Sequence, residues 1–262
     1  AAASVLVDIV PVLASLLDPK RDPTLRMTAL SLLDHLLTAD SCASSDEMGE
    51  WAVDIYGVML LPNLVWRAGK AAEHVRLASA LCLSKLLPLP HLSGETLASH
   101  LDDALPLFTS ALDDDNVETR RLMCSILASA LPRLTGAALS SETVRRLYPE
   151  MLKRLDDASD EIRLQVCTSL VALIRCFTYS AIHSTSSNLD KTNYQYFLRG
   201  LLVHLDDPSH NIQQAVGSVV GEAMHAAPPV CIEELRAVRD RQRSPQLCNE
   251  LLAKARDIGQ LV

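Results

Sequence analysis

Acidic doublets are the groups in this sequence whose types and spacing could do chemistry. Neighbouring carboxylates can hold a metal ion or act together as acid and base. They recur at four places: Asp102-Asp103, Asp113-Asp114-Asp115, Asp156-Asp157 and Asp206-Asp207. Because they return at the same turn of successive sequence units, we interpret them as residues that end and cap helices.

A second candidate is the cluster His204-x-Asp206-Asp207-x-x-His210, which could supply zinc ligands. Its spacing does not match the pair of histidines four residues apart that binds zinc on a helix face. We therefore predict no metal site and no cofactor in this chain.

Seven cysteines lie apart from one another, without a Cys-x-x-Cys motif. This does not resemble a disulfide framework or a zinc ribbon, and reduced thiols fit a cytosolic protein. Cys124 and Cys167 occupy equivalent places in two units and are predicted to pack in the core. Serine nucleophile elbows, phosphate-binding glycine loops and dinucleotide fingerprints are absent from the sequence, so we expect no catalytic residues and no enzyme.

The composition limits the classes of partner. The chain has 262 residues and a net charge of −8, which argues against nucleic acid. Apolar runs are too short for a membrane span, and the first residues lack the basic region of a secretory signal. Ala1-Ala2-Ala3 leads directly into a helical pattern, so we expect a fragment of a longer protein.

One pattern of two helices recurs along the chain. A proline lies in the first helix, an aspartate at its end and an arginine near the start of the second. The prolines are Pro11, Pro62, Pro106 and Pro149, the aspartates Asp18, Asp113, Asp156 and Asp206, and the arginines Arg26, Arg76, Arg120 and Arg163. We expect each proline to come early in its helix and to bend or start it. A fifth unit has Gln213 in place of the arginine.

The intervals between these arginines are close to the ~40–47 residues of HEAT and armadillo repeats. The sequence thus predicts an all-α, right-handed superhelical solenoid of HEAT repeats as a single domain over residues 1–262. The expected repeats are about 4–37, 50–87, 95–134, 141–177 and 192–226.

A terminal helical pair at 229–260 is expected to follow the break at Pro228-Pro229. Charges on its outer faces, Glu233, Glu234, Arg236, Arg239, Arg241 and Arg243, would form a polar cap. The two longer intervals contain insertions at Thr38–Glu50 and Thr178–Lys191, and the second is predicted to be a mobile loop.

The repeated charges suggest a ladder between repeats. Asp113, Asp156 and Asp206 would pair with Arg120 and Arg163.

Trp66 departs from the repeat pattern. The equivalent positions hold Ser15, Ser110 and Lys153, which are surface types, and the neighbours of Trp66 are Arg67 and Lys70. Trp and Arg are enriched at binding hot spots, so we predict a partner-binding site at Trp66, Arg67 and Lys70. The alternative is that Trp66 fills space under the longer turn Ala68–Glu73.

Three segments carry a resemblance to a known family. They are Leu60-Leu61-Pro62-Asn63-Leu64-Val65-Trp66-Arg67-Ala68-Gly69-Lys70, Tyr148-Pro149-Glu150-Met151-Leu152-Lys153-Arg154-Leu155-Asp156-Asp157 and Leu201-Leu202-Val203-His204-Leu205-Asp206-Asp207-Pro208. From about residue 50 onward, the chain resembles the C-terminal HEAT repeats of the dynein axonemal assembly factors. The resemblance implies a cytoplasmic, non-enzymatic scaffold for pre-assembly of dynein arms. The implied partners are dynein intermediate and heavy chains, other assembly factors and chaperones.

Two other readings stay open. One is a generic HEAT adaptor, such as a transport receptor or phosphatase scaffold. Transport receptors expose acidic inner faces, whereas the second helices here are expected to expose small residues: Ser79, Ser125, Ser129, Thr168 and Ala172. The other is an enzyme, which a bound metal or cofactor would support.

Overall fold

Helices make up all the regular structure in the part of the chain that the computed structural model describes, residues 3–134, 139–183, 190–243 and 245–260. This confirms the predicted all-α class and the likeness to HEAT and armadillo repeats. Leucine and alanine dominate the buried side chains, and such residues favour helices and allow them to pack closely. The chain divides into two compact units, Ala1–Arg133 and Leu134–Val262.

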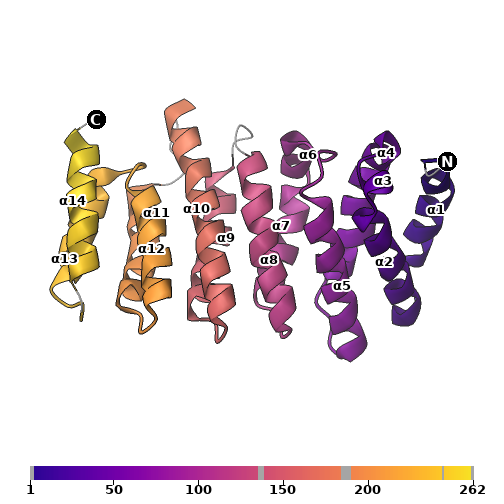
Figure 1. The fold of residues 1–262 in the computed structure, drawn as a ribbon, viewed down its shortest axis with the longest axis horizontal. Helices are drawn as coiled ribbons and strands as arrows, with labels where there is room; N and C mark the ends of the chain where they lie inside the picture. Colours follow the sequence, from indigo (N-terminus) through magenta and orange to yellow (C-terminus); the bar gives the residue numbers. More distant parts are fainter. Residues whose placement is uncertain (1–2, 135–138, 184–189, 244, 261–262) are drawn as a thin grey trace. The chain divides into compact units, whose positions relative to one another are not determined.

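The first unit contains two layers of helices (Figure 1). One layer holds α2, α5 and α8, and the other holds α1, α4 with the turns η1 and η2, and α7. The bounds are α1 (Ala3–Leu16), α2 (Pro23–Thr38), α3 (Asp40–Ala43), α4 (Asp46–Asp54), η1 (Ile55–Leu60, a π-helical turn), η2 (Leu61–Leu64, a 3₁₀ turn), α5 (Lys70–Leu86), α6 (Gly94–Ser99), α7 (Leu101–Leu112), α8 (Val117–Ala130) and η3 (Leu131–Leu134).

The second unit repeats this scheme. Helices α9, α11 and α13 are neighbours in one layer, and α10, α12 and α14 are neighbours in the other. The bounds are α9 (Ser141–Lys153), η4 (Arg154–Asp156), α10 (Asp160–His183), α11 (Lys191–Leu202), η5 (Val203–Asp206), α12 (His210–Ala223), α13 (Pro228–Arg239) and α14 (Gln246–Gln260). Each helix buries one apolar stripe against its neighbours, as in other repeat proteins.

Prolines lie inside the first helices, although not where we expected them. Pro11, Pro106 and Pro149 are all past the first turn of α1, α7 and α9. In α9, for example, the helix begins at Ser141, after the capping residue Ser140, so more than one turn of helix precedes Pro149. Pro62 differs, because it lies in the first turn of η2.

The insertions are largely helical. Thr38–Glu50 contains the short helix α3 and the start of α4. The predicted loop Thr178–Lys191 is wrong in its first part, because α10 continues to His183. Residues 184–189 lie outside the described residues.

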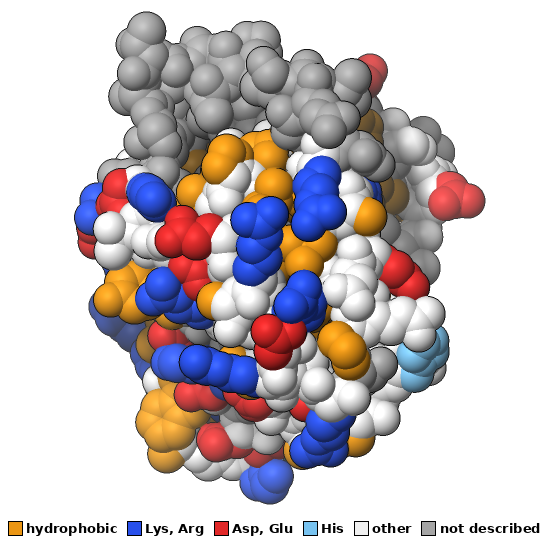
Figure 2. Space-filling model, turned by 90° about the vertical axis from the view of Figure 1, so that its left-hand side faces the viewer, with side chains coloured by type: hydrophobic (Ala, Val, Ile, Leu, Met, Phe, Trp, Pro, Cys, Tyr) orange, Lys and Arg blue, Asp and Glu red, His pale blue; other side chains and the backbone are white. Residues whose placement is uncertain are grey.

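The terminal pair begins with its prolines. Pro228 and Pro229 form the first turn of α13, where their missing N–H groups are not needed. Figure 2 shows that the side of the molecule with α13 and α14 carries basic and acidic side chains in mixture. The prediction that Glu234 lies on the outer face is wrong. It is 4% exposed and accepts two hydrogen bonds from Arg199 of α11, both of 2.8 Å.

None of the described helices combines the length and the apolar composition that crossing a membrane would require.

Candidate protein-interaction site

The turn between the two helices of the second repeat is built differently from the others. It runs from Val65 to Gly69, between η2 and α5. Gly69 has φ +102° and ψ 150°, a backbone conformation open to glycine and costly for other residues. In the part of the chain that the structure describes, no side chain caps the N-terminus of α5, whereas Asp22 caps α2 and Asn116 caps α8.

The ordinary turns of this fold hold an aspartate that links two repeats. Asp114 accepts hydrogen bonds from Arg76 Nε (2.6 Å) and Nη2 (3.3 Å), and both side chains are buried. Asp207 accepts from Arg163 Nη2 in the same way. Each aspartate also accepts from the backbone N–H two residues later, at Asn116 (2.9 Å) and Ser209 (2.8 Å), and this turn directs the carboxylate inward.

The ladder prediction therefore needs a correction in its register. Arg163 pairs with Asp207, the second aspartate of the doublet, and not with Asp206. Asp113 and Asp156 are exposed at the ends of their helices. Asp206 lies beside Arg243, whose backbone N–H donates to it at 2.8 Å. At these turns the first aspartate stands at the end of the preceding helix or 3₁₀ turn, and the second has the turn geometry that points its carboxylate inward.

In the second repeat, Arg67 stands where the ladder aspartate should be. In two other repeats the residue that opens the second helix bonds to the backbone oxygen of the ladder aspartate: Arg120 Nη1 to Asp114 O at 2.9 Å, and Gln213 Nε2 to Asp207 O at 2.6 Å. Arg163 bonds instead to Leu155 O, at 2.8 Å. The equivalent bond of Arg76 goes to Arg67 O at 2.8 Å. The charge at this ladder position is thus reversed.

Arg26 faces this reversed position from the first repeat. Its side chain is buried, its Nη1 donates to Asn63 Oδ1 at 3.0 Å, and its Nε has no hydrogen-bond partner among the described residues. Burial lowers the pKa of Arg26, the nearby charge of Arg67 lowers it further, and Asp22 opposes both effects. Asp22 itself accepts the N–H of Thr24.

The neutral side chain of Asn63 takes the place of the absent carboxylate as the hydrogen-bond acceptor of Arg26. It is 2% exposed, and its amide nitrogen donates to Leu17 O at 2.8 Å and to Met59 O at 2.7 Å. Sequence analysis missed this residue and Asp114.

The predicted site residues Trp66, Arg67 and Lys70 do lie together on this turn. Trp66 is 49% exposed, and the Arg76 guanidinium lies 5.8 Å from the centre of its ring. Arg67 is exposed and donates to Pro19 O at 3.3 Å. Lys70 is exposed and pairs with Glu73 at 2.9 Å. Trp66 therefore covers Arg76 on one side and faces solvent on the other.

The carboxylate of Glu73 is bonded by Asn116 and Lys70. Asn116 donates to it at 3.0 Å, and this bond, together with Lys70, holds the pKa of Glu73 below its ordinary value. The outer surface of the turn consequently keeps a basic and aromatic character.

The histidine and aspartate cluster of the fifth repeat is dispersed into separate roles. His204 is buried with Nε2 4.0 Å from Asp156, Asp207 pairs with Arg163, and His210 is exposed at the start of α12. Among the described residues, no group of three or more His, Cys, Asp and Glu side chains is placed to hold a metal ion.

Cys124 and Cys167 pack in the core, as predicted. Cys124 is fully buried and Cys167 is 4% exposed, as the core prediction required. Burial raises the pKa of the Cys167 thiol to about 12, which disfavours the reactive thiolate.

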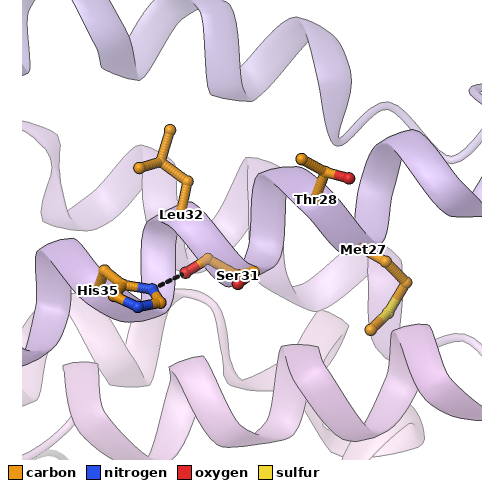
Figure 3. Close-up of a pocket in the computed structure, with 5 residues that line it drawn as sticks. All are labelled: Met27, Thr28, Ser31, Leu32 and His35. Atoms are coloured by element: carbon orange, nitrogen blue, oxygen red, sulfur yellow. Dashed lines mark hydrogen bonds between the residues drawn. The ribbon is translucent and has the colours of Figure 1, made fainter.

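Two surface hollows lie among the described residues, and neither brings together a set of catalytic groups. The larger of these two, of about 730 Å³, lies along α2 and is lined by Met27, Thr28, Ser31, Leu32 and His35. All five come from one helix, and His35 Nδ1 lies 2.6 Å from Ser31 O (Figure 3). A smaller hollow between α10 and α12 is lined by small and apolar residues, including Thr168 and Ser218.

The predicted inner face is partly wrong. Ser79 is fully buried and donates to Leu60 O at 2.9 Å, and Ala172 is 7% exposed. Thr168 is exposed, while Ser125 and Ser129 are half-buried. Close packing of the two layers buries small residues that a helical-wheel argument places at the surface.

Comparison with known proteins supplies the relationship. No family model matches the chain. The chain is 33% identical over 245 residues to "Dynein axonemal assembly factor 5" of Xenopus laevis, and 32% identical over 254 residues to the protein of that name in Homo sapiens. These matches cover 93% and 96% of the chain. The chain spans only 29% of the length of each of these relatives.

Solved structures share the fold at low sequence identity. Yeast importin-beta superposes with a TM-score of 0.58 at 13% identity, covering 98% of this chain and 30% of its own. A designed armadillo repeat protein in complex with a (KR)4 peptide superposes with a TM-score of 0.56 at 14% identity, covering 95% and 98%. These likenesses show the fold alone. The relatives show that, over nearly its whole length, this chain is similar to the C-terminal part of dynein axonemal assembly factor 5.

Proposed function

We propose that this chain is part of a non-enzymatic scaffold for the cytoplasmic pre-assembly of axonemal dynein arms. In this role it binds dynein intermediate and heavy chains, other assembly factors and chaperones. The observation that carries the proposal is the 31–33% identity to proteins named dynein axonemal assembly factor 5 over 93–96% of the chain.

The architecture supports a binding role. Stacked helix pairs create long surfaces on which each repeat can present different side chains. The second repeat presents an exposed tryptophan and two exposed basic residues on one turn. Such residue types are those that most often dominate protein–protein binding energy.

An affinity experiment tests the proposal. The tagged chain is immobilised and exposed to the cytosol of ciliating cells, and dynein intermediate chain is quantified in the eluate. We expect its enrichment over a designed armadillo repeat protein, which has a similar fold and an unrelated sequence. The same experiment with extracts of isolated axonemes tests whether the interaction belongs to the cytoplasm.

Two results would count against the proposal. One is equal recovery of dynein intermediate chain by both baits. The other is enrichment of nuclear transport or phosphatase subunits in place of dynein chains, which would indicate a general adaptor.

A further inference from the structure

The charge of the ladder is complete at two observed junctions and reversed at one. Asp114 meets Arg76, and Asp207 meets Arg163, each across a pair of adjacent repeats. Between the first and second repeats, Arg67 occupies the aspartate's position and Arg26 faces it. Two like charges therefore stand where the fold elsewhere places an ion pair.

This arrangement leaves a buried charge poorly compensated. Arg26 is 6% exposed, and the side-chain acceptor it binds is the neutral amide oxygen of Asn63. A buried guanidinium is stabilised by a carboxylate far more than by an amide, because desolvation of its charge must be offset. A carboxylate arriving from outside the chain and binding the exposed Arg67 would offset the like charges of Arg26 and Arg67.

An apolar contact surface adjoins the charges. Trp66 and Val65 are 49% and 40% exposed on the same turn, and Lys70 adds a second exposed cation. The ring of Trp66 can pack against an aliphatic side chain, and the guanidinium of Arg67 can bind a carboxylate with two hydrogen bonds. A partner segment with one acidic and one aliphatic side chain close together in sequence would use both.

We propose that the exposed residues Trp66, Arg67 and Lys70, beside the buried Arg26, form a docking site for an acidic, leucine-containing segment of a protein partner, one carboxylate of which supplies the charge of the missing ladder aspartate. Charge complementarity selects this occupant: the chain as a whole has a net charge of −8, whereas this turn presents cations and an aromatic ring. The inference specifies the partner chemistry of the scaffold proposed above and rests on that function.

A synthetic probe tests the site without any dynein protein. The probe is a fluorescein-labelled peptide of alternating glutamate and leucine, with a glutamine-for-glutamate peptide as its neutral match. Fluorescence anisotropy should show binding of the acidic peptide and no comparable binding of the neutral one. Because no dynein chain is present, this test and the affinity experiment above can fail independently.

The variant Arg67→Asp separates binding from folding. It restores the ladder acid, so its thermal midpoint should equal or exceed that of the unmodified chain, while affinity for the acidic peptide falls by roughly tenfold or more. Arg236→Asp makes the same charge change on an exposed residue of α13 and should leave peptide affinity unchanged. Trp66→Ala should weaken binding with a nearly unchanged thermal midpoint.

Three results would overturn the inference. The first is unchanged peptide affinity in Arg67→Asp. The second is equal weakening by Arg67→Asp and Arg236→Asp, which would indicate attraction by net charge alone. The third is a dimer in analytical ultracentrifugation that Arg67→Asp dissociates, because the occupant would then be a second copy of this chain.

Discussion

Asp114 shows how one carboxylate serves two repeats. It binds Arg76 with two side-chain hydrogen bonds and accepts the N–H of Asn116, and both charged side chains are almost fully buried. Asp114→Ala should lower the free energy of unfolding by about 3–5 kcal/mol, because it leaves a charged arginine buried. Urea denaturation measures this loss. Asp115→Ala is the matched control, since its side chain is exposed; equal effects of both would contradict the ladder.

His204 should make stability depend on pH. Burial lowers its pKa below the ordinary 6.5; Arg163 lowers it further, while Asp156 and Asp207 oppose the shift. In the unfolded chain the ring takes up a proton as pH falls through 6.5, but in the folded chain only at lower pH. Its contribution to stability is therefore present above that value and is lost as pH falls through the folded pKa.

The substitution His204→Gln isolates this effect. The drop in thermal midpoint between about pH 7.5 and about pH 5.5 should be smaller in the variant than in the unmodified chain. His210→Gln, at an exposed position of the same repeat, serves as the control. An unaltered pH dependence in His204→Gln would exclude His204 as the titrating group.

At the level of single residues, the sequence predicted the types better than the contacts. The repeated positions identified Arg163 as a member of a ladder, whereas Arg76 was predicted only as a repeat position and its pairing with Asp114 was not. They could not show which aspartate of a doublet turns inward, because that depends on the backbone of the turn. The sequence did not identify Arg67 as a ladder residue, because its turn is longer than the others. The spacing between Asp114 and Arg120, counted back from Arg76, leads to Lys70 and not to Arg67.

Among the elements, α5 depends on one glycine at its start. The backbone of Gly69 at φ +102° and ψ 150° is accessible mainly to glycine, although a methyl group there would meet no other atom within 4 Å. Gly69→Ala should therefore lower the unfolding free energy by about 1–3 kcal/mol through backbone strain alone.

A second glycine provides the matched control. Gly217 lies within α12, and a methyl group there would contact Leu247 at an ordinary 3.4 Å. Gly217→Ala should be neutral or stabilising, because alanine favours a helix interior over glycine by about 1 kcal/mol. Chemical denaturation of the two variants gives the comparison, and a loss of similar size at both sites would argue against strain at Gly69.

Helix existence followed from the apolar periodicity, whereas helix ends did not. The end of α10 is an example, because the helix continues to His183 through the first part of the segment predicted to be a loop. Prolines at 228 and 229 look like a break in the sequence, yet the first turn of a helix tolerates them. The sequence likewise predicts Glu234 to be a surface charge, but Arg199 of α11 donates two hydrogen bonds to it and accounts for its burial.

For the molecule as a whole, a repeat architecture predicts that damage stays local. Within each compact unit, helix pairs contact their neighbours in sequence, and α13 packs against α11, α12 and α14. The free energy of such a protein is nearly a sum of repeat terms and nearest-neighbour interface terms. A destabilised end should then open without unfolding the distant repeats.

Leu235→Ala tests this locality. Leu235 is fully buried in α13, so removing its side chain should cost about 2–5 kcal/mol in the terminal pair. Hydrogen exchange measured by mass spectrometry should accelerate in α11 to α14 and stay unchanged in α1 to α5. Arg236→Ala, one residue away and exposed, should alter neither region. Faster exchange throughout both compact units after Leu235→Ala would instead mean that the chain unfolds as one cooperative body. The turn at Trp66 would then open together with the terminal helical pair.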